Sequence, residues 1–346
     1  MTLHERLEAF WAGERPDQIP YTIYHYEWRH TKEDPAWDAM FEAGLGVTCP
    51  VGACKAQERA VERAVTTEVV DGVSIRKQTV QTSEGAIWQT WKDGWHDQYL
   101  LKTAEDYRVM TNIVRNTTLL PNYEKVESHS MTIGPYGVQW LSIGRTPLQT
   151  ILVDFAGLEN FAFHLVDFEE EVRELFDAML EKFRQTVEIT SKAPGRFVSN
   201  LENFTAESLG PDRFAEFLLP VYEECFPMLH DAGKIVGYHY DGHTACCKDV
   251  IAKAPIDVIE SLTEPNEGDQ TLSEARAVWP DKLFWCNIRV GDYNLPPAEL
   301  RAKVLSLVEQ GSVHGKCFAF EVSEQYPHNW RESIPIVLDA LRDTQT

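Results

Sequence analysis

Residues 234–262 of the chain read KIVGYHYDGHTACCKDVIAKAPIDVIESL. A short apolar run at 234–236 precedes a polar, glycine-containing segment, a helix-like stretch covers 246–254, and a second apolar run covers 256–262. Strand, loop, helix and strand in this order are typical of one parallel βα unit. The stretch therefore predicts that this part of the chain lies in a parallel sheet with helices packed on it.

The same alternation continues on both sides of this stretch. Further strands are expected at 19–24, 138–141, 196–203, 283–288 and 316–322, and helices at 3–12, 103–115, 147–155, 169–192, 211–232, 271–278, 297–310 and 332–342. About seven or eight strands, each followed by a helix, are typical of a TIM barrel. We therefore expect an α/β fold, a TIM (β/α)8 barrel with an N-terminal elaboration that includes β-hairpins.

The elaboration is expected at residues 66–92, where three strand-like runs are separated by Asp71-Gly72 and Glu84-Gly85. Such pairs favour the tight turns of antiparallel hairpins. No Gly-, Ser- or Pro-rich linker divides the 346 residues, a length that suits one large barrel. We predict a single domain spanning 1–346, with the hairpin insertion near the barrel mouth.

Composition excludes several classes of partner. A formal net charge of −22 repels nucleic acids and polyphosphates at long range. No run of about 18 apolar residues is present, and Met1 to Arg6 form no apolar signal core, so we expect no membrane contact and a cytoplasmic location. The odd number of cysteines, seven, indicates reduced thiols rather than a disulfide framework.

Polar side chains at strand ends are the candidate site residues, because catalytic groups of TIM barrels lie at the carboxyl ends of the strands. The candidates are Glu202, Asn203, His239, Asp241, Glu260, Cys286, Asn287, Glu321 and Glu324. His239 and Asp241 are two residues apart and therefore point the same way, so they can share a metal ion or a substrate. We expect His239, Asp241 and Glu260 to be catalytic, and Glu202, Asn203 and Cys286 to contact the substrate.

Aromatic and sulfur-containing side chains add to this list. Tyr26 and Trp28 follow the first predicted strand and are expected to line a pocket for an aromatic or apolar substrate. His243, Cys246 and Cys247 could form a metal site, although at the start of a helix the two thiols are more typical of core packing.

Four segments resemble the uroporphyrinogen decarboxylase superfamily. They are Arg6-Leu7-Glu8-Ala9-Phe10 with Asp17-Gln18-Ile19-Pro20, Glu202-Asn203 before Leu209-Gly210-Pro211, His239-Tyr240-Asp241-Gly242, and Glu267-Gly268-Asp269. The resemblance covers nearly the whole chain, and the spacing is most similar to the corrinoid-linked methyltransferase branch. The Arg-rich N-terminal segment that true decarboxylases use for tetrapyrrole carboxylates is replaced by Tyr, His, Glu and Trp at 21–28.

The resemblance implies a zinc site. In the methyltransferase branch a His-x-Cys-Gly motif and a later strand-end Cys bind zinc; here Asp241 stands at the first Cys position, and the last strand ends in Glu321. His239, Asp241 and Glu321 would supply one imidazole and two carboxylates, a known ligand set for a divalent ion with open positions. Such zinc is a harder Lewis acid than a thiolate-bound ion, which suits an oxygen- or nitrogen-linked methyl donor.

The resemblance also implies the activity, a methyltransferase that moves a methyl group from an O- or N-methyl donor to a corrinoid. The sequence has no Asp-x-His-x-x-Gly corrinoid-binding motif, so the corrinoid is expected on a separate partner protein. One alternative is a decarboxylase that holds substrate carboxylates with Arg145 or Arg289. A non-catalytic ligand-binding barrel is the other alternative.

Overall fold

The computed structural model describes residues 1–346 except 133, 205, 313–317, 324 and 345–346. By its internal contacts the chain forms two compact units. The first comprises Met1–Ala53, Tyr123–Gly144 and Thr190–Thr346, and the second comprises Cys54–Asn122 and Arg145–Ile189. The prediction of one domain with hairpins near the barrel mouth stays a prediction, which limited proteolysis tests.

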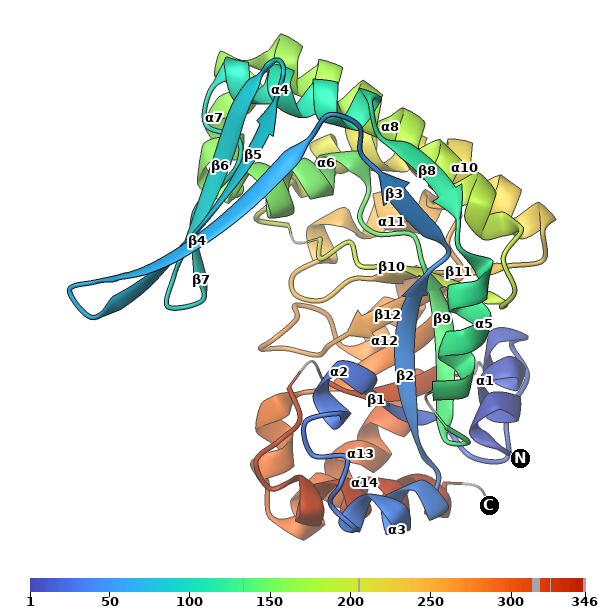
Figure 1. Cartoon of the computed structure of the whole chain (residues 1–346). Coiled ribbons are helices and arrows are strands. Elements are labelled where there is room, and N and C mark those ends of the chain that lie inside the picture. The colour runs from blue at the N-terminus through green and yellow to red at the C-terminus, as the bar shows by residue number, and fades with distance from the viewer. Residues whose placement is uncertain (133, 205, 313–317, 324, 345–346) are drawn as a thin grey trace. The chain divides into compact units, whose positions relative to one another are not determined.

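The first unit is built on a closed barrel of eight parallel strands, in the spatial order β1-β14-β13-β12-β11-β10-β9-β2 (Figure 1). The strands are β1 (Tyr21–Tyr24), β2 (Leu45–Gly52), β9 (Gly137–Ser142), β10 (Phe197–Asn200), β11 (Ile235–His239), β12 (Val258–Leu262), β13 (Leu283–Ile288) and β14 (Phe318–Val322). This topology confirms the predicted TIM barrel. It also places the carboxyl ends of all eight strands at one end of the barrel.

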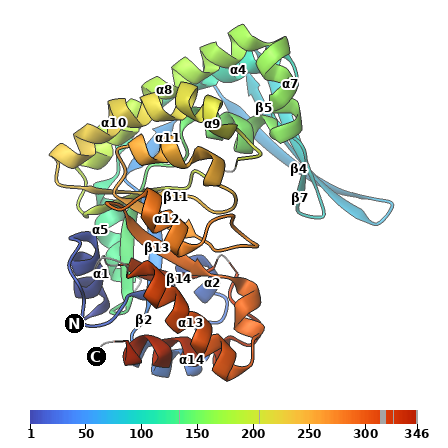
Figure 2. The same cartoon turned by 180° about the vertical axis from the view of Figure 1, so that it is seen from behind.

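Helices alternate with these strands (Figure 2). They are α1 (Leu3–Trp11), α2 (His25–Trp28), α3 (Ala36–Glu42), α5 (Tyr123–Thr132), α9 (Gly210–Arg213) and α10 (Leu219–Asp231), joined by the π-helix η2 (Phe214–Leu218), then η3 (Ala245–Cys247), α11 (Lys248–Lys253), α12 (Leu272–Val278), η4 (Val290–Asn294), α13 (Pro297–Gly311) and α14 (Trp330–Asp343). Several begin at sites marked in the sequence: Thr2 with Glu5 and Thr271 with Glu274 form capping boxes.

Strand β2 was missed in the sequence analysis. It contains Gly46, Pro50 and Gly52, residue types that rarely occur inside central strands. The structure gives a reason for Gly46, since a Cβ there would lie 1.9 Å from the Leu3 side chain of α1. Close packing of α1 on the barrel, rather than strand propensity, therefore explains this glycine.

The barrel interior is filled by aromatic side chains that meet α1. Trp11 stacks on Phe197 with ring centroids 5.0 Å apart, and Trp140 meets Trp285 edge-on at 5.7 Å. Phe197 is the first residue of β10, so this cluster occupies the amino end of the barrel. The opposite end, where the strands terminate, is left for polar side chains.

The second unit carries the antiparallel elaboration that the sequence predicts. A four-stranded sheet has the order β4 (Glu62–Val70), β5 (Val73–Thr82), β6 (Gly85–Lys92), β7 (Trp95–Gln98), and β3 (Cys54–Gln57) pairs with β8 (Thr118–Pro121). Asp71 and Gly72 both have positive φ, as do Asp93 and Gly94, which is typical of type I′ hairpin turns. The hairpins are confirmed, and β7 extends them by one strand.

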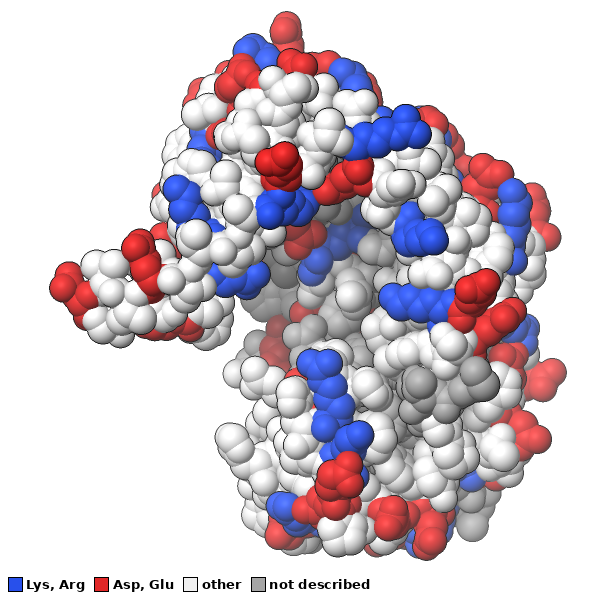
Figure 3. All heavy atoms as spheres, viewed as in Figure 1, with Lys and Arg blue, Asp and Glu red and all other residues white. Residues whose placement is uncertain are grey.

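Helices complete this second unit. They are α4 (Ala104–Arg115), α6 (Pro147–Thr150), the π-helix η1 (Ile151–Ala156), α7 (Leu158–Asp167) and α8 (Glu169–Ser191). Among the described residues, no helix combines the length and the apolar character needed to cross a membrane. On the face of the molecule shown in Figure 3, Lys and Arg are interspersed with Asp and Glu.

Candidate active site

The site begins with two adjacent strand ends. His239 is the last residue of β11, and its register partner on β12 is Glu260. Neighbours in register on parallel strands point to the same face of the sheet, so these side chains meet. His239 Nδ1 lies 2.6 Å from Glu260 Oε2, with the histidine 1% exposed and the glutamate fully buried. The acid that hydrogen-bonds the imidazole is therefore Glu260, whereas the sequence analysis paired His239 with Asp241.

Asp241 lies on the other side of the imidazole ring of His239. Its Oδ1 lies 3.9 Å from His239 Nε2, and its side chain is 38% exposed. Because Glu260 fixes the Nδ1 side of the ring, the Nε2 side faces Asp241, whose side chain as a whole is partly exposed. A carboxylate that is hydrogen-bonded to one ring nitrogen fixes the orientation of a histidine, so that the other nitrogen can take part in proton transfer or ligand binding.

Tyr24, at the end of β1, completes the contacts of Glu260. Its hydroxyl donates to Glu260 Oε1, so each carboxylate oxygen has a partner. Burial raises the pKa of Tyr24 well above its ordinary value, and the charge of Glu260 adds to this, so the phenol remains a proton donor. The sequence analysis did not single out Tyr24 for this role, because the phenol reaches Glu260 only through closure of the barrel.

Glu321 on β14 lies in the same polar layer. Its Oε1 accepts from the hydroxyls of Thr48, at 2.8 Å, and Thr22, at 3.2 Å. Trp285 Nε1 in turn donates to Thr22 at 3.2 Å, which leaves the threonine hydroxyl proton for Glu321. Two hydroxyl donors on Oε1 mark it as the acceptor oxygen of the carboxyl group.

Glu321 and Glu260 are buried carboxyl groups whose pKa values shift in opposite directions. Burial, and then the charge of Glu260, raise the pKa of Glu321 well above its ordinary value. Burial also opposes ionisation of Glu260, but the charge of His239 and the hydrogen bonds from His239, Tyr24 and Glu321 hold its pKa below the ordinary value. At neutral pH the pair therefore consists of a Glu260 carboxylate beside a Glu321 carboxylic acid.

The strand that carries Glu260 is irregular at its next residue. The pairing of β12 with β13 shifts register between Glu260 and Leu262, and Ser261 has a φ of 67°. The Ser261 hydroxyl accepts from the Asn287 amide at 2.5 Å. Bulges of this kind commonly redirect side chains near active sites. This bulge was not predicted: Glu260 and Asn287 were among the sequence candidates, but Ser261 was not.

The loop after β12 braces the loop that carries Asp241. Asp269 accepts from the backbone N–H groups of Thr244 and Ala245 at 2.9–3.1 Å. Gly268 permits this, because a Cβ there would lie 1.9 Å from the Thr263 carbonyl oxygen. The Glu267-Gly268-Asp269 segment found in the sequence therefore positions the neighbouring loop.

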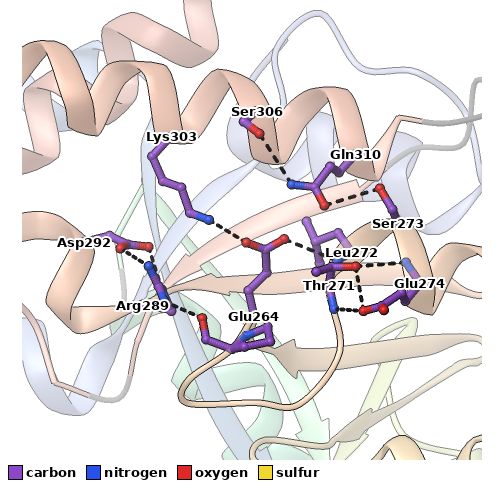
Figure 4. A network of polar contacts seen from close by, with 11 residues as sticks. Glu264, Thr271, Leu272, Ser273, Glu274, Arg289, Asp292, Lys303, Ser306 and Gln310 are labelled. Carbon is purple, nitrogen blue, oxygen red and sulfur yellow. Dashed lines mark hydrogen bonds and ion pairs between the residues drawn. The ribbon is translucent and has the colours of Figure 1, made fainter.

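A second network of polar contacts holds the loop that follows β12 (Figure 4). Glu264 pairs with Lys303 of α13 at 2.6 Å, and its other carboxylate oxygen accepts from the Leu272 N–H at the start of α12. Arg289 pairs with Asp292 and donates to the carbonyl of Pro265. Each cation here already has an acidic partner, so the network stabilises the loop rather than offering a carboxylate-binding site.

Glu202, predicted to contact the substrate, lies in a different cluster. Its Oε2 accepts from the Asn200 amide at 2.7 Å, and this amide also contacts the Tyr238 hydroxyl at 2.8 Å. Tyr238 packs on Tyr222 of α10, and the charge of Glu202 acts on both phenols. Tyr238 precedes His239, so its side chain is on the outer face of β11. Alternation along the strand separates Glu202 from the His239 side.

Asn203 and Cys286 also have described positions. Asn203 is half-buried directly after Glu202, with a φ of 47°. Cys286 follows Trp285, which points into the barrel, and therefore faces outward, near the guanidinium of Arg276 on α12. Burial raises the pKa of the Cys286 thiol far above its usual range. The structure places this thiol between the barrel and its helices, on the face of β13 opposite to Trp285, and its contact with a substrate stays a prediction.

The predicted aromatic residues of α2 divide between two environments. Tyr26 stacks on Tyr24, ring centroids 5.1 Å apart, and is 36% exposed. Trp28 instead packs edge-on against Phe41 of α3 at 5.9 Å. Only Tyr26 is thus joined to the polar layer of Glu260, through Tyr24.

The predicted zinc ligands do not gather as a set. Among the described residues, no three His, Cys, Asp or Glu side chains converge as a metal site. His239 and Asp241 face each other, but Glu321 is hydrogen-bonded to Thr22 and Thr48, and burial raises its pKa, which disfavours the ionised form that a metal would bind. The described residues therefore do not fit the triad of His239, Asp241 and Glu321. Cys317 and Glu324 lie outside the described residues.

Comparison with known proteins supports the fold. No protein-family model matches the sequence, and no curated protein is significantly similar to it. Among solved structures the chain is similar to a methyltransferase from Methanosarcina mazei, with a TM-score of 0.58, 13% identity, and 99% of each chain covered. It is also similar to a B12-independent methionine synthase from Shewanella sp. W3-18-1, with a TM-score of 0.47, 11% identity, and 91% of this chain and 87% of that chain covered. The likeness to the Methanosarcina mazei methyltransferase shows the barrel fold alone, and the resemblance to the uroporphyrinogen decarboxylase superfamily stays a prediction.

Proposed function

We propose that this protein is a methyltransferase that moves a methyl group from an O- or N-methyl donor to a corrinoid carried by a separate protein. The observation that carries the proposal is the buried His239–Glu260 pair at the carboxyl end of the barrel, with the Nε2 side of the ring directed toward Asp241. The sequence motif His239-Tyr240-Asp241-Gly242 and the barrel that resembles a methanogen methyltransferase support the same reaction class.

His239 acts as the general acid in this proposal. The Glu260 carboxylate, hydrogen-bonded at Nδ1, stabilises a protonated imidazole, as a buried acid does in other histidine-dependent sites. Nε2–H then donates to the oxygen or nitrogen of the donor as its bond to the methyl carbon breaks. Asp241 at 3.9 Å adds a negative charge that favours protonation at Nε2.

The reaction balances without a redox partner beyond the corrinoid. A reduced corrinoid supplies the electron pair that forms the new bond to the methyl carbon. The carbon–oxygen or carbon–nitrogen bond of the donor breaks, its electron pair stays on the heteroatom, and the proton from His239 neutralises it. Tyr26, stacked on Tyr24, offers an aromatic surface for a methoxylated aromatic donor.

Zinc would use His239 and Asp241 and would need a further donor. Because Glu321 is already held by Thr22 and Thr48, the proposal assigns activation of the leaving group to the proton of His239. Metal analysis of the purified protein measures any contribution from zinc directly.

A decarboxylase, the second candidate, would need cations to hold substrate carboxylates. Of the two arginines that the sequence suggests for this, Arg289 pairs with Asp292, and Arg145 pairs with Asp154 at 3.3 Å. These ion pairs favour methyl transfer over decarboxylation. A non-catalytic barrel would leave the buried acid–histidine pair without a chemical role.

The decisive test supplies methoxylated aromatics and methylamines to the purified chain, with free cob(I)alamin as the methyl acceptor. Loss of the cob(I)alamin absorbance, dependent on both donor and His239, is the expected result. Wild-type protein that releases carbon dioxide from a carboxylated analogue, or that consumes no donor of either class, would contradict the proposal.

A further inference from the structure

Two adjacent thiols lie on the loop that connects β11 to α11. Cys246 and Cys247 occupy the short turn η3, and their sulfur atoms are 3.5 Å apart. Cys247 is fully buried, whereas Cys246 is exposed. The sequence analysis favours core packing for both, and for Cys246 this is wrong, because the 3₁₀ turn directs consecutive side chains to different sides.

The turn that holds these thiols is rigidly supported. Asp269 accepts from the N–H groups of Thr244 and Ala245, and the Cys247 N–H donates to the Thr244 carbonyl at 2.9 Å. The Gln270 amide donates to the Thr244 hydroxyl at 3.0 Å. The two sulfur atoms are thus held near each other before any ligand arrives, which lowers the entropic cost of binding.

We propose that Cys246 and Cys247 form a dithiol site that captures one trivalent arsenic species through both sulfurs. Two sulfurs that bind one ion with bonds of about 2.3 Å and an angle of roughly 100° lie about 3.5 Å apart, which is the spacing observed. A disulfide between the two is disfavoured, because neighbouring Cα atoms are about 3.8 Å apart and disulfides usually need about 4.4–6.8 Å.

The protonation of the buried thiol selects the class of ligand. Burial, and then the hydrogen bond with Cys246, raise the pKa of Cys247 to about 12, so this sulfur keeps its proton at neutral pH. A bare cation such as zinc must displace that proton into solvent. A trivalent arsenic oxide carries its own acceptor: two S–H bonds break, two As–S bonds form, and the oxygen leaves as water with the oxidation state of arsenic unchanged.

Phenylarsine oxide is the probe for this site on the full-length reduced protein. We expect one adduct per chain, mapped to Cys246 and Cys247 by mass spectrometry. The adduct should resist excess monothiol and be removed by 1,2-ethanedithiol. Cys246→Ser leaves a single sulfur, so affinity should fall about 10²–10⁴-fold, the usual loss when a second tethered contact is removed.

Cys54→Ser is the matched control, because Cys54 is a partly exposed thiol in the other compact unit. It should bind phenylarsine oxide as the wild type does. Cys246 is exposed, so its replacement should leave the circular dichroism spectrum unchanged. Equal affinity of Cys246→Ser and wild type, an adduct on another cysteine, or tighter binding of zinc than of the arsenical would overturn the inference. The readout is mass and affinity, so it is independent of methyl transfer.

Discussion

The two faces of β11 each bury a glutamate among tyrosines, yet they differ in what the glutamate can do. On the inner face, Glu260 contacts His239 and Tyr24, and its charge raises the pKa of Glu321. On the outer face, Glu202 accepts from Asn200 beside the phenols of α10 and its neighbouring strand. A buried acid at a strand end is therefore insufficient to identify a site. The partner that the acid orients makes the difference.

The largest expected effect comes from the inner face. His239→Gln keeps an amide that can donate to Glu260 but removes the acid, so methyl transfer should fall about 10²–10⁴-fold. The neighbouring outer-face change Tyr238→Phe should keep activity and cost about 1 kcal/mol of unfolding free energy through its lost hydrogen bond. Rates with cob(I)alamin and thermal melts measure both. Comparable losses of rate in the two variants would break the comparison of faces.

The two buried glutamates provide the second test. Glu260→Gln leaves His239 in place without a negative partner, so the rate should fall about 10- to 100-fold, as when a carboxylate that orients a functional histidine is removed. Glu202→Gln should change the rate little and destabilise the fold by about 1–3 kcal/mol. A rise in KM in Glu202→Gln with unchanged stability would instead support the substrate contact expected from the sequence.

The third test measures how the contribution of Glu321 to the unfolding free energy changes with pH. Because burial and Glu260 raise its pKa in the folded state, its favourable contribution is complete below the unfolded pKa of about 4.3 and is lost as pH rises toward the folded pKa. The unfolding free energy of Glu321→Gln should therefore increase relative to wild type as pH rises above 5, by about 1.4 kcal/mol for each pH unit up to the folded pKa of Glu321.

Glu274 is the control for this measurement, because hydrogen bonds with Thr271 lower its pKa. Glu274→Gln should lose stability relative to wild type only as pH rises toward the unfolded pKa of about 4.3, the opposite sign, and the difference should stay constant from pH 5 to pH 8. A zinc ligand at Glu321 would give a different outcome again, since Glu321→Gln would then release metal and melt lower at every pH above 5.

The smallest effect is expected at Cys286. Its thiol faces Arg276 and the helices outside the barrel, so Cys286→Ala should cost about 1 kcal/mol of unfolding free energy and leave KM unchanged. Denaturant unfolding and donor titrations check the two parts. A selective change in KM would place the thiol near the substrate, against the alternation along β13.

The order of strands and helices could be predicted because local patterns determine it. Apolar runs, capping boxes such as Thr271 with Glu274, and the Asp71-Gly72 turn act over a few residues. Strand β2 was not predicted because its Gly46 is required by close packing against Leu3, which is more than forty positions away in the sequence. The prediction of His239 as a site residue also rests on a local feature, its place at a strand end.

The tertiary structure decided which partners these residues have. The barrel closes by pairing β1 with β14 on one side and with β2 on the other. This closure brings Tyr24 to Glu260, and Thr22 and Thr48 to Glu321, across more than two hundred positions of sequence. The sequence by itself determined the elements and the residue types at the strand ends, since those depend on short-range propensity and alternation. Protonation and pairing depend on burial and on charges brought close by barrel closure, so only the folded chain determines them.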